Sequence, residues 1–385
     1  MKKTSSLKIA FPVSSVWFGA LVGPSMISGA FSIVYFAPYG IWGLLLPLAA
    51  MGTAATIIGM GSEVARRHKL YDYHSYTKCL YGTNSIGKIL CIIMEIYMLF
   101  AMVVGGSSVM AMGGIFLNDL LGVHQVWGSV LMAALSIVIV LWGAKLVRAT
   151  SSVMSVIMVT GMILLTVFAI YFNPAGFQDM FSAERVVQHP PIAAGIWNAL
   201  LLGLSNACNA LTLCSVEQTL TEKRHSAAVG ICSFILNSTA FIIETLAVLP
   251  YCTDPNVLSH SVPVLYIVSN FLSGYAPWLP AVYMITMFFG LVSSGAPQLH
   301  AVATRMKPYY PNKTFFKNDK TQHFITGIIY FAVCIAISQL GLRTIISQGY
   351  SLLGYLAMPL LIIPICVLMP LRWRKERQKQ IVNPE

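Results

Sequence analysis

The feature that most constrains the fold is a series of ten long apolar runs, separated by short polar segments. A membrane-spanning helix takes about 20 mostly apolar residues. Only 10% of the residues are charged, against about 25% in soluble domains. The runs are continuous rather than alternating as in outer-membrane barrels, so the sequence predicts an all-α membrane protein. The predicted spans are residues 11–37, 40–62, 87–117, 125–145, 149–172, 191–220, 226–250, 277–304, 323–341 and 347–370.

The placement of Lys and Arg predicts how these spans are oriented. With both termini in the cytoplasm, all of the 24 Lys and Arg residues except Arg185 and Arg343 fall on the cytoplasmic side. This is the bias that the positive-inside rule describes, and a missed or extra span would scramble it. The net charge of +11 is therefore expected to face membrane lipid rather than nucleic acid. We expect a multi-pass protein of the cytoplasmic membrane with both termini cytoplasmic.

The first span is poorly suited to a continuous helix. Its segment Trp17–Ala30 contains Pro24, which lacks a backbone N–H, and glycines and serines that weaken a helix. Broken backbone at membrane depth is tolerated only where protein or a polar cavity satisfies it. We interpret the segment as a helix broken around a binding site. A packing helix with a simple proline kink explains this segment alone equally well.

A partial copy of this segment lies 180 residues further on. Trp17, Leu21, Gly23 and Ser25 recur as Trp197, Leu201, Gly203 and Ser205. Five spans separate the copies, so they enter the membrane from opposite sides. Paired interrupted helices in two inverted halves are typical of secondary transporters. The predicted parts are a first repeat (1–172), an extracellular loop (173–190), a second repeat (191–370) and a basic cytoplasmic tail (371–385). The connection 251–277 is too short to span and is expected to lie across an outer vestibule.

Two groups of residues are candidates for binding. Half-helix termini and small polar side chains suit a small solute, although each Ser or Asn could instead make a helix–helix hydrogen bond. Two adjacent hydroxyls in the eighth span, Ser293 and Ser294, suit a monovalent cation, although they could bond back to their own helix. The substrate candidates are Gly23, Pro24, Ser25, Ser28, Ser205, Asn206 and Asn209.

Ionisable residues within spans are costly and functional by default. Glu95 and Glu244 are the deepest acids and are candidates for a proton relay, whereas Glu217 and His300 are expected to be solvated near the cytoplasmic ends. No Lys or Arg is expected deep in a span. The glycine pairs of the third span, at 105–106 and 113–114, are expected to pack against the broken helices.

The sequence shows no phosphate loop, no metal-spaced His/Cys set and no nucleophile elbow. It therefore predicts a protein that is not an enzyme and needs no cofactor. The oligomeric state stays open.

The chain resembles a known group of transporters. Its pattern is similar to the five-plus-five inverted repeat of the LeuT-like fold in the amino acid–polyamine–organocation superfamily. Within that superfamily it resembles the YkvI-like bacterial membrane proteins. The motifs that carry the resemblance are Val22–Gly29, Leu204–Ala207, Gly354–Leu356 and Ile362–Pro364. The resemblance implies a bacterial inner membrane and a sodium site formed by the carbonyls of Gly19 and Val22 with the hydroxyls of Ser293 and Ser294.

One departure from the subfamily pattern leaves the substrate open. Its first-span motif usually continues from Ser-Gly into a polar pair that includes a carboxylate, whereas Ser28 and Gly29 are followed here by Ala30 and Phe31. The leading hypothesis is a Na⁺-coupled transporter of a small, amino-acid-like solute that works by alternating access. The alternatives are a proton-coupled transporter of the same fold and a solute sensor or receptor subunit that does not transport.

Overall fold

The computed structural model describes residues 6–21, 28–142, 144–179, 190–310 and 318–382, and the side chains of 144–155, 293, 308, 377 and 379–382 are left aside. The described residues form helices and turns, with no strand among them. In the labels below, η marks 3₁₀ and π-helical segments. The first half forms α1 (Ser6–Leu21), η1 (Ser32–Phe36), η2 (Ala37–Leu44), α3 (Leu46–His68), α4 (Tyr73–Tyr81), α5 (Ser85–Leu121), α6 (Gln125–Leu141), α7 (Ala144–Phe172) and α8 (Pro174–Asp179).

The second half begins after residue 190. It forms α9 (Ile192–Ser205), η4 (Asn206–Cys208), α10 (Asn209–Thr212), η5 (Leu213–Thr219), α11 (Lys223–Val248), η6 (Leu249–Tyr251), α12 (Pro255–Ser259), α13 (Pro263–Ile267), η7 (Val268–Leu272), α14 (Leu279–Met306), η8 (Lys307–Tyr309), α15 (Asp319–Ser338), α16 (Leu342–Thr344), η10 (Ile345–Gly349), α17 (Tyr350–Ala357), η11 (Met358–Leu368) and α18 (Met369–Val382).

The helices match the predicted spans in position. Seven helical stretches among the described residues are long and apolar enough to cross a membrane, and α1, α6 and the apolar part of α7 are shorter. The seven long stretches overlap seven of the ten predicted runs, and α1, α6 and the apolar part of α7 overlap the other three. A fourth short apolar segment, Pro263–Leu272, has no predicted span, so the number of ten spans stays a prediction. Two short helices, α4 and α8, were not predicted, and the connection 251–277 folds into α12, α13 and η7.

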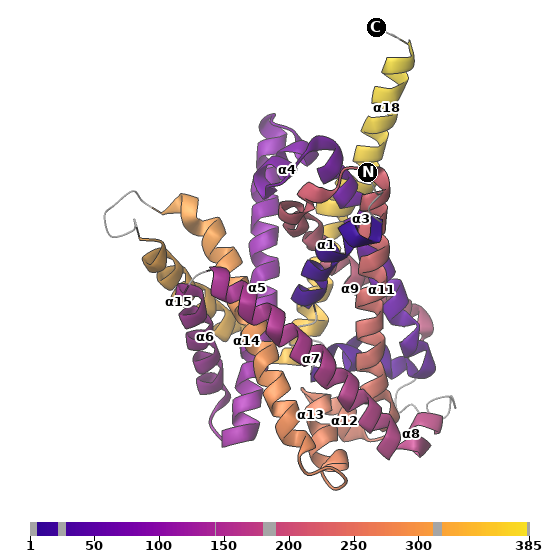
Figure 1. Ribbon diagram of the computed structural model, residues 1–385, viewed down its shortest axis with the longest axis vertical. Coiled ribbons are helices and arrows are strands. Elements are labelled where there is room, and N and C mark those ends of the chain that lie inside the picture. Colours follow the sequence, from indigo (N-terminus) through magenta and orange to yellow (C-terminus); the bar gives the residue numbers. More distant parts are fainter. Residues whose placement is uncertain (1–5, 22–27, 143, 180–189, 311–317, 383–385) are drawn as a thin grey trace.

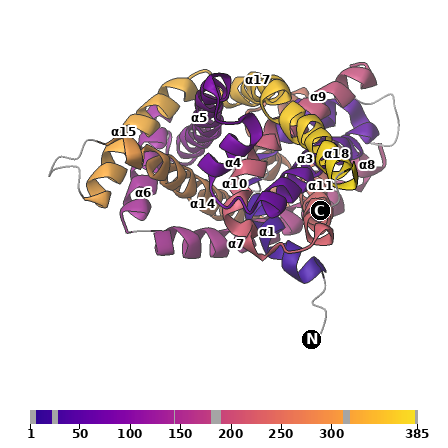
Figure 2. The ribbon, with the colours of Figure 1, turned by 90° about the horizontal axis from the view of Figure 1, so that it is seen from above.

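The helices pack in two groups (Figures 1 and 2). In one group α5, α6, α14 and α15 each pack on the other three. In the other, α11 packs on α1 and α3, α3 packs on α9, and α17 covers α9. The tilted helix α7 contacts both α14 and α11, so it links the two groups. The buried core is continuous through both groups.

The expected packing of the third-span glycines is wrong. A side chain at Gly106 would overlap Tyr330 and Cys334 of α15, and one at Gly113 would overlap Met132 of α6. These glycines therefore allow α5 to approach its own group of helices, not the interrupted ones. Small residues permit close packing wherever they lie, and spacing alone does not identify the partner.

The basic segments gather at one end of the molecule. Arg66 of α3 donates to the carbonyl of Thr221 just before α11, and Arg372 of α18 donates to the carbonyl of Cys79 on α4. Arg343 lies at the opposite end and donates to the carbonyl of Leu258 on α12. The first and last helices, α1 and α18, extend to the basic end, whereas α8, α12 and α13 lie at the other (Figure 1).

Candidate functional site

The first span is interrupted where the sequence predicts it. The α1 helix ends at Leu21, and a helix resumes around the non-helical residue Gly29. Gly29 has φ +73°, and a Cβ there would lie 2.7 Å from a methyl of Val264. Glycine is therefore required for both its left-handed backbone and its close contacts. Ser28 is fully buried, and its hydroxyl oxygen accepts a hydrogen bond from the N–H of Ala30 at 3.1 Å. Four predicted site residues, Val22, Gly23, Pro24 and Ser25, lie outside the described residues.

A buried carboxylate holds the restart of this helix. The N–H of Ser32 donates to Oε1 of Glu244 on α11 at 3.1 Å. A helix start leaves N–H groups without partners inside the helix, and an acidic group there is favourable. Glu244 is fully buried, and its Oε2 has no hydrogen-bond partner within the described part of the chain. Glu244 thus joins the seventh span to the second half of the first.

The interruption of the sixth span has a different form. The α9 helix ends at Ser205, and 3₁₀ turns follow at Asn206–Cys208 and Leu213–Thr219. The chain tightens here without unwinding. The polar side chains predicted to face substrate bond to their own helix. Ser205 Oγ and Asn206 Nδ2 both donate to the carbonyl of Leu202, at 2.7 and 3.0 Å, and Asn209 Nδ2 donates to the carbonyl of Asn206 at 3.0 Å.

Two glycines from the sequence motifs bring other helices against this sixth span. A Cβ at Gly203 would lie 2.2 Å from the carbonyl oxygen of Ala50 on α3. A Cβ at Gly354 on α17 would lie 2.5 Å from the carbonyl oxygen of Leu201. Helix six is therefore held between the second and tenth spans with backbone-to-backbone contact.

The proposed cation residues are only partly placed. Ser294 is buried on α14, and its Oγ makes no hydrogen bond within the described residues. The side chain of Ser293 is not among those that the structure describes. Gly19 lies in the last turn of α1, whereas α14 packs mainly on α7, α5, α6 and α15. The contact between Gly19 and the serine pair thus remains a prediction.

Glu95 does not have the environment that the sequence predicts. Its carboxylate forms an ion pair with Arg305 of α14 at 3.2 Å, and both side chains are partly exposed. The Arg305 guanidinium also stacks over the ring of Tyr73 on α4, 3.9 Å from its centre. Arg305 lies in the last turn of α14, just beyond the predicted end of the eighth span, so this ion pair does not contradict the expectation that no Lys or Arg lies deep in a span. Glu95 belongs to a charged contact among α4, α5 and α14, not to an isolated buried acid.

Glu217 is also placed differently from expectation. It is fully buried, and the hydroxyl of Ser62 on α3 donates to its Oε1. The expectation of a solvated residue is wrong, because η5 is covered by α1, α3 and α4. Because the sequence did not predict the short helix α4, it did not predict that α4 helps to cover Glu217.

The sequence reasoning missed an aromatic connection between the first and last spans. Phe31 packs edge-on against Tyr350 with ring centres 5.0 Å apart, and Tyr35 Oη donates to the carbonyl of Ile346 at 2.8 Å. The i, i+4 spacing of Phe31 and Tyr35 was the available signal, since it places both rings on one helix face.

Comparisons with known proteins show the fold. No family model matches the chain. It is 22% identical over 373 residues to the uncharacterised membrane protein YkvI of Bacillus subtilis, covering 96% of this chain and 98% of that protein.

Solved structures match over nearly the whole chain. The transporter Mhp1 in its inward-facing conformation aligns with a TM-score of 0.66 at 12% identity, over 92% of this chain and 75% of that one. MhsT in complex with L-phenylalanine aligns at 0.61 with 15% identity, over 92% and 88%. A Na⁺-coupled sialic acid symporter in a substrate-bound outward-open state aligns at 0.57 with 12% identity, over 94% and 84%. The chain thus has the LeuT-like fold of multi-pass membrane transporters.

Proposed function

We propose that this chain, with its LeuT-like fold, is a secondary active transporter of a small organic solute, coupled to Na⁺ and working by alternating access. The observation that carries the proposal is the interrupted first span, whose second half restarts on the carboxylate of Glu244. Buried hydrogen bonds stabilise this interruption. A regular helix would satisfy the same backbone groups at a lower free-energy cost, so a binding site explains the interruption better than a simple proline kink does.

The proposed substrate site lies between the interrupted spans. It comprises Gly23, Pro24, Ser25 and Ser28 from the first, with Ser205, Asn206 and Asn209 from the sixth. The side-chain donors of Ser205, Asn206 and Asn209 are already hydrogen-bonded to carbonyls of their own helix. We propose that these residues shape the site and that their remaining polar atoms are available to the substrate. The complex of MhsT with L-phenylalanine supports an amino-acid-like solute.

The proposed cation site joins the carbonyls of Gly19 and Val22 to the hydroxyls of Ser293 and Ser294. Its support is the Ser294 hydroxyl, which is buried and unpaired within the described residues. A buried hydroxyl without a partner is unfavourable, and a coordinated cation would satisfy it. The Na⁺-coupled symporter among the structural neighbours supports sodium as that cation.

The proposed location is the bacterial inner membrane with both termini cytoplasmic. Both terminal helices extend to the end that carries most of the basic residues (Figure 1). Such an excess is typical of the cytoplasmic side.

The test is a thermal-shift screen of the full chain in detergent with a panel of L-amino acids, in Na⁺ and in choline. We expect at least one amino acid to raise the melting temperature in Na⁺ only. The double variant Ser293→Ala plus Ser294→Ala should lose this Na⁺ dependence. The control Ser338→Ala, which removes a hydroxyl bonded to its own helix at Ile335, should keep it. Unchanged Na⁺ dependence in the double variant would exclude the proposed cation site.

A second candidate function, coupling to protons, is favoured by Glu244. This acid is buried, accepts a hydrogen bond from Ser32 at the start of the second half of the first span, and has one unpaired oxygen among the described residues. Burying a carboxylate in an apolar core is unfavourable unless it is neutralised, and a proton would do so. Glu95 is a weaker relay because Arg305 already neutralises it.

A further inference from the structure

A groove runs along the outside of the molecule between α3 and α11. It encloses about 570 Å³ and is separate from the interrupted spans. Its lining residues recur every three to four positions on each helix, so each helix presents one face to it. The lining residues used below are Gly52, Gly59, Glu63, Lys223, Ala227 and Trp373.

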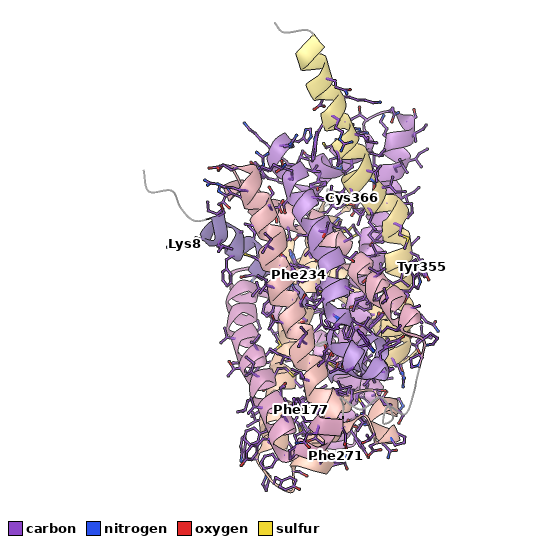
Figure 3. The ribbon with its side chains drawn as sticks, turned by 90° about the vertical axis from the view of Figure 1, so that its right-hand side faces the viewer. Lys8, Phe177, Phe234, Phe271, Tyr355 and Cys366 are labelled. Atoms are coloured by element: carbon purple, nitrogen blue, oxygen red, sulfur yellow. The ribbon has the colours of Figure 1, made fainter. Side chains whose placement is uncertain are left out.

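The groove exists because small residues meet at its floor. A Cβ at Gly59 would lie 3.3 Å from the Cα of Gly230 on α11. The two backbones therefore touch, and no large side chain fills the surface above them. Phe234 closes the end near Gly52, where a Cβ would lie 3.6 Å from its ring. Figure 3 shows Phe234 at nearly the level of Lys8 and well away from Phe177 and Phe271, which lie near the opposite end of the molecule.

The length of the groove fits one leaflet of a bilayer. From Gly52 to Glu63 the α3 helix rises about 16 Å. Half of the hydrocarbon core of a bilayer is about 15 Å. The groove is thus about as long as one leaflet is deep, and it ends at the basic end of the molecule, near Glu63 and Lys223.

The charge at the basic end suits an anionic head group. Glu63 accepts hydrogen bonds from both Arg66 and Arg67, at 2.8 and 2.7 Å, so two cations share one anion. Lys223 adds an exposed positive charge on the opposite wall. Arg67 stacks over Trp373 of α18, 4.1 Å from the ring centre, and tryptophan is typical of the membrane–water interface.

We propose that this groove binds one anionic phospholipid from the leaflet at the basic end. Its acyl chain lies over Gly59, and its phosphate lies near Lys223 and Arg66. The lipid bridges α3, α11 and α18. Basic pockets between membrane helices bind such head groups. The observations favour a lipid over a second copy of this chain, since the groove has the depth of a leaflet and a cationic end.

The test is native mass spectrometry of the full chain in detergent, titrated with phosphatidylglycerol or phosphatidylcholine. We expect one tightly retained phosphatidylglycerol and weaker retention of phosphatidylcholine. Lys223→Ala should weaken phosphatidylglycerol binding about fivefold, the usual effect of one basic residue near anionic lipid. The control Lys78→Ala removes an exposed charge from α4, outside the groove, and should change little.

A second pair of variants tests the acyl chain. Ala227→Trp fills the groove and should abolish retention, whereas Ile235→Trp places the same bulk on an exposed part of α11 outside it. Equal retention of both lipids, or unchanged binding in Ala227→Trp, would overturn the proposal. A dimer that Ala227→Trp converts to monomer would show instead that the groove receives a second copy of the chain.

Discussion

At the scale of single residues, Glu244 has a structural role that its position in the sequence does not reveal. It contacts Ser32, 212 residues away, and supplies the acceptor that the restarting helix needs. The sequence marked Glu244 as a deep acid but offered no partner for it. The partner is a backbone N–H, and backbone groups carry no signal in the sequence.

Replacing Glu244 by Gln separates the two possible coupling ions. Gln keeps an oxygen that can accept from Ser32, so the helix restart should survive, but it cannot take up a proton. If coupling is to Na⁺, Glu244→Gln should retain Na⁺-dependent ligand stabilisation. A pH gradient alone should drive no uptake into proteoliposomes that contain either protein. Uptake driven by that gradient in the parent, with its loss in Glu244→Gln, would establish proton coupling.

At the scale of elements, the sixth span is held in place by two neighbouring helices whose backbones approach it closely. Gly203 lets α3 touch it from one side, and Gly354 lets α17 touch it from the other. The same glycine positions appeared in the sequence as repeat and family motifs. Their physical reason, a missing Cβ between two backbones, became visible only with the neighbours in place.

Substituting Gly203 by Ala should destabilise the protein. The new Cβ would lie 2.2 Å from a backbone oxygen, which cannot move as a flexible side chain can. Overpacking of this kind costs about 1–3 kcal/mol. We expect a lower melting temperature in detergent. Gly274→Ala is the matched control, because no atom lies within 4 Å of its added Cβ. Equal stability of the two variants would contradict the packing described here.

The positions of the elements were largely predictable, whereas their partners were not. Long apolar runs and charge bias located the spans, because both follow from transfer into lipid. The short helices α4 and α8 lack that signal. The ion pair of Glu95 with Arg305 joins residues 210 positions apart, so no local pattern could reveal it. For the candidate site, the sequence located the interruptions, but it did not show that Ser205 and Asn206 bond to their own helix.

At the scale of the whole molecule, the two helix groups suggest how an alternating-access cycle would proceed. The group containing α5, α6, α14 and α15 is mutually packed, and α7 links it to α11. We propose that the group containing α1, α3, α9 and α11 moves against it. The hydrogen bond that Tyr97 of α5 donates to the carbonyl of Leu353 on α17, at 3.4 Å, joins the two groups and is one of the connections that such a movement would break.

The most direct test of the central claim is solute counterflow. Proteoliposomes containing the full chain are loaded with an amino acid that stabilises it, diluted into a trace of the same labelled amino acid, and assayed in Na⁺ and in choline. We predict transient accumulation of label that requires both the protein and Na⁺. Binding of the amino acid without any counterflow would contradict transport and identify the chain as a sensor.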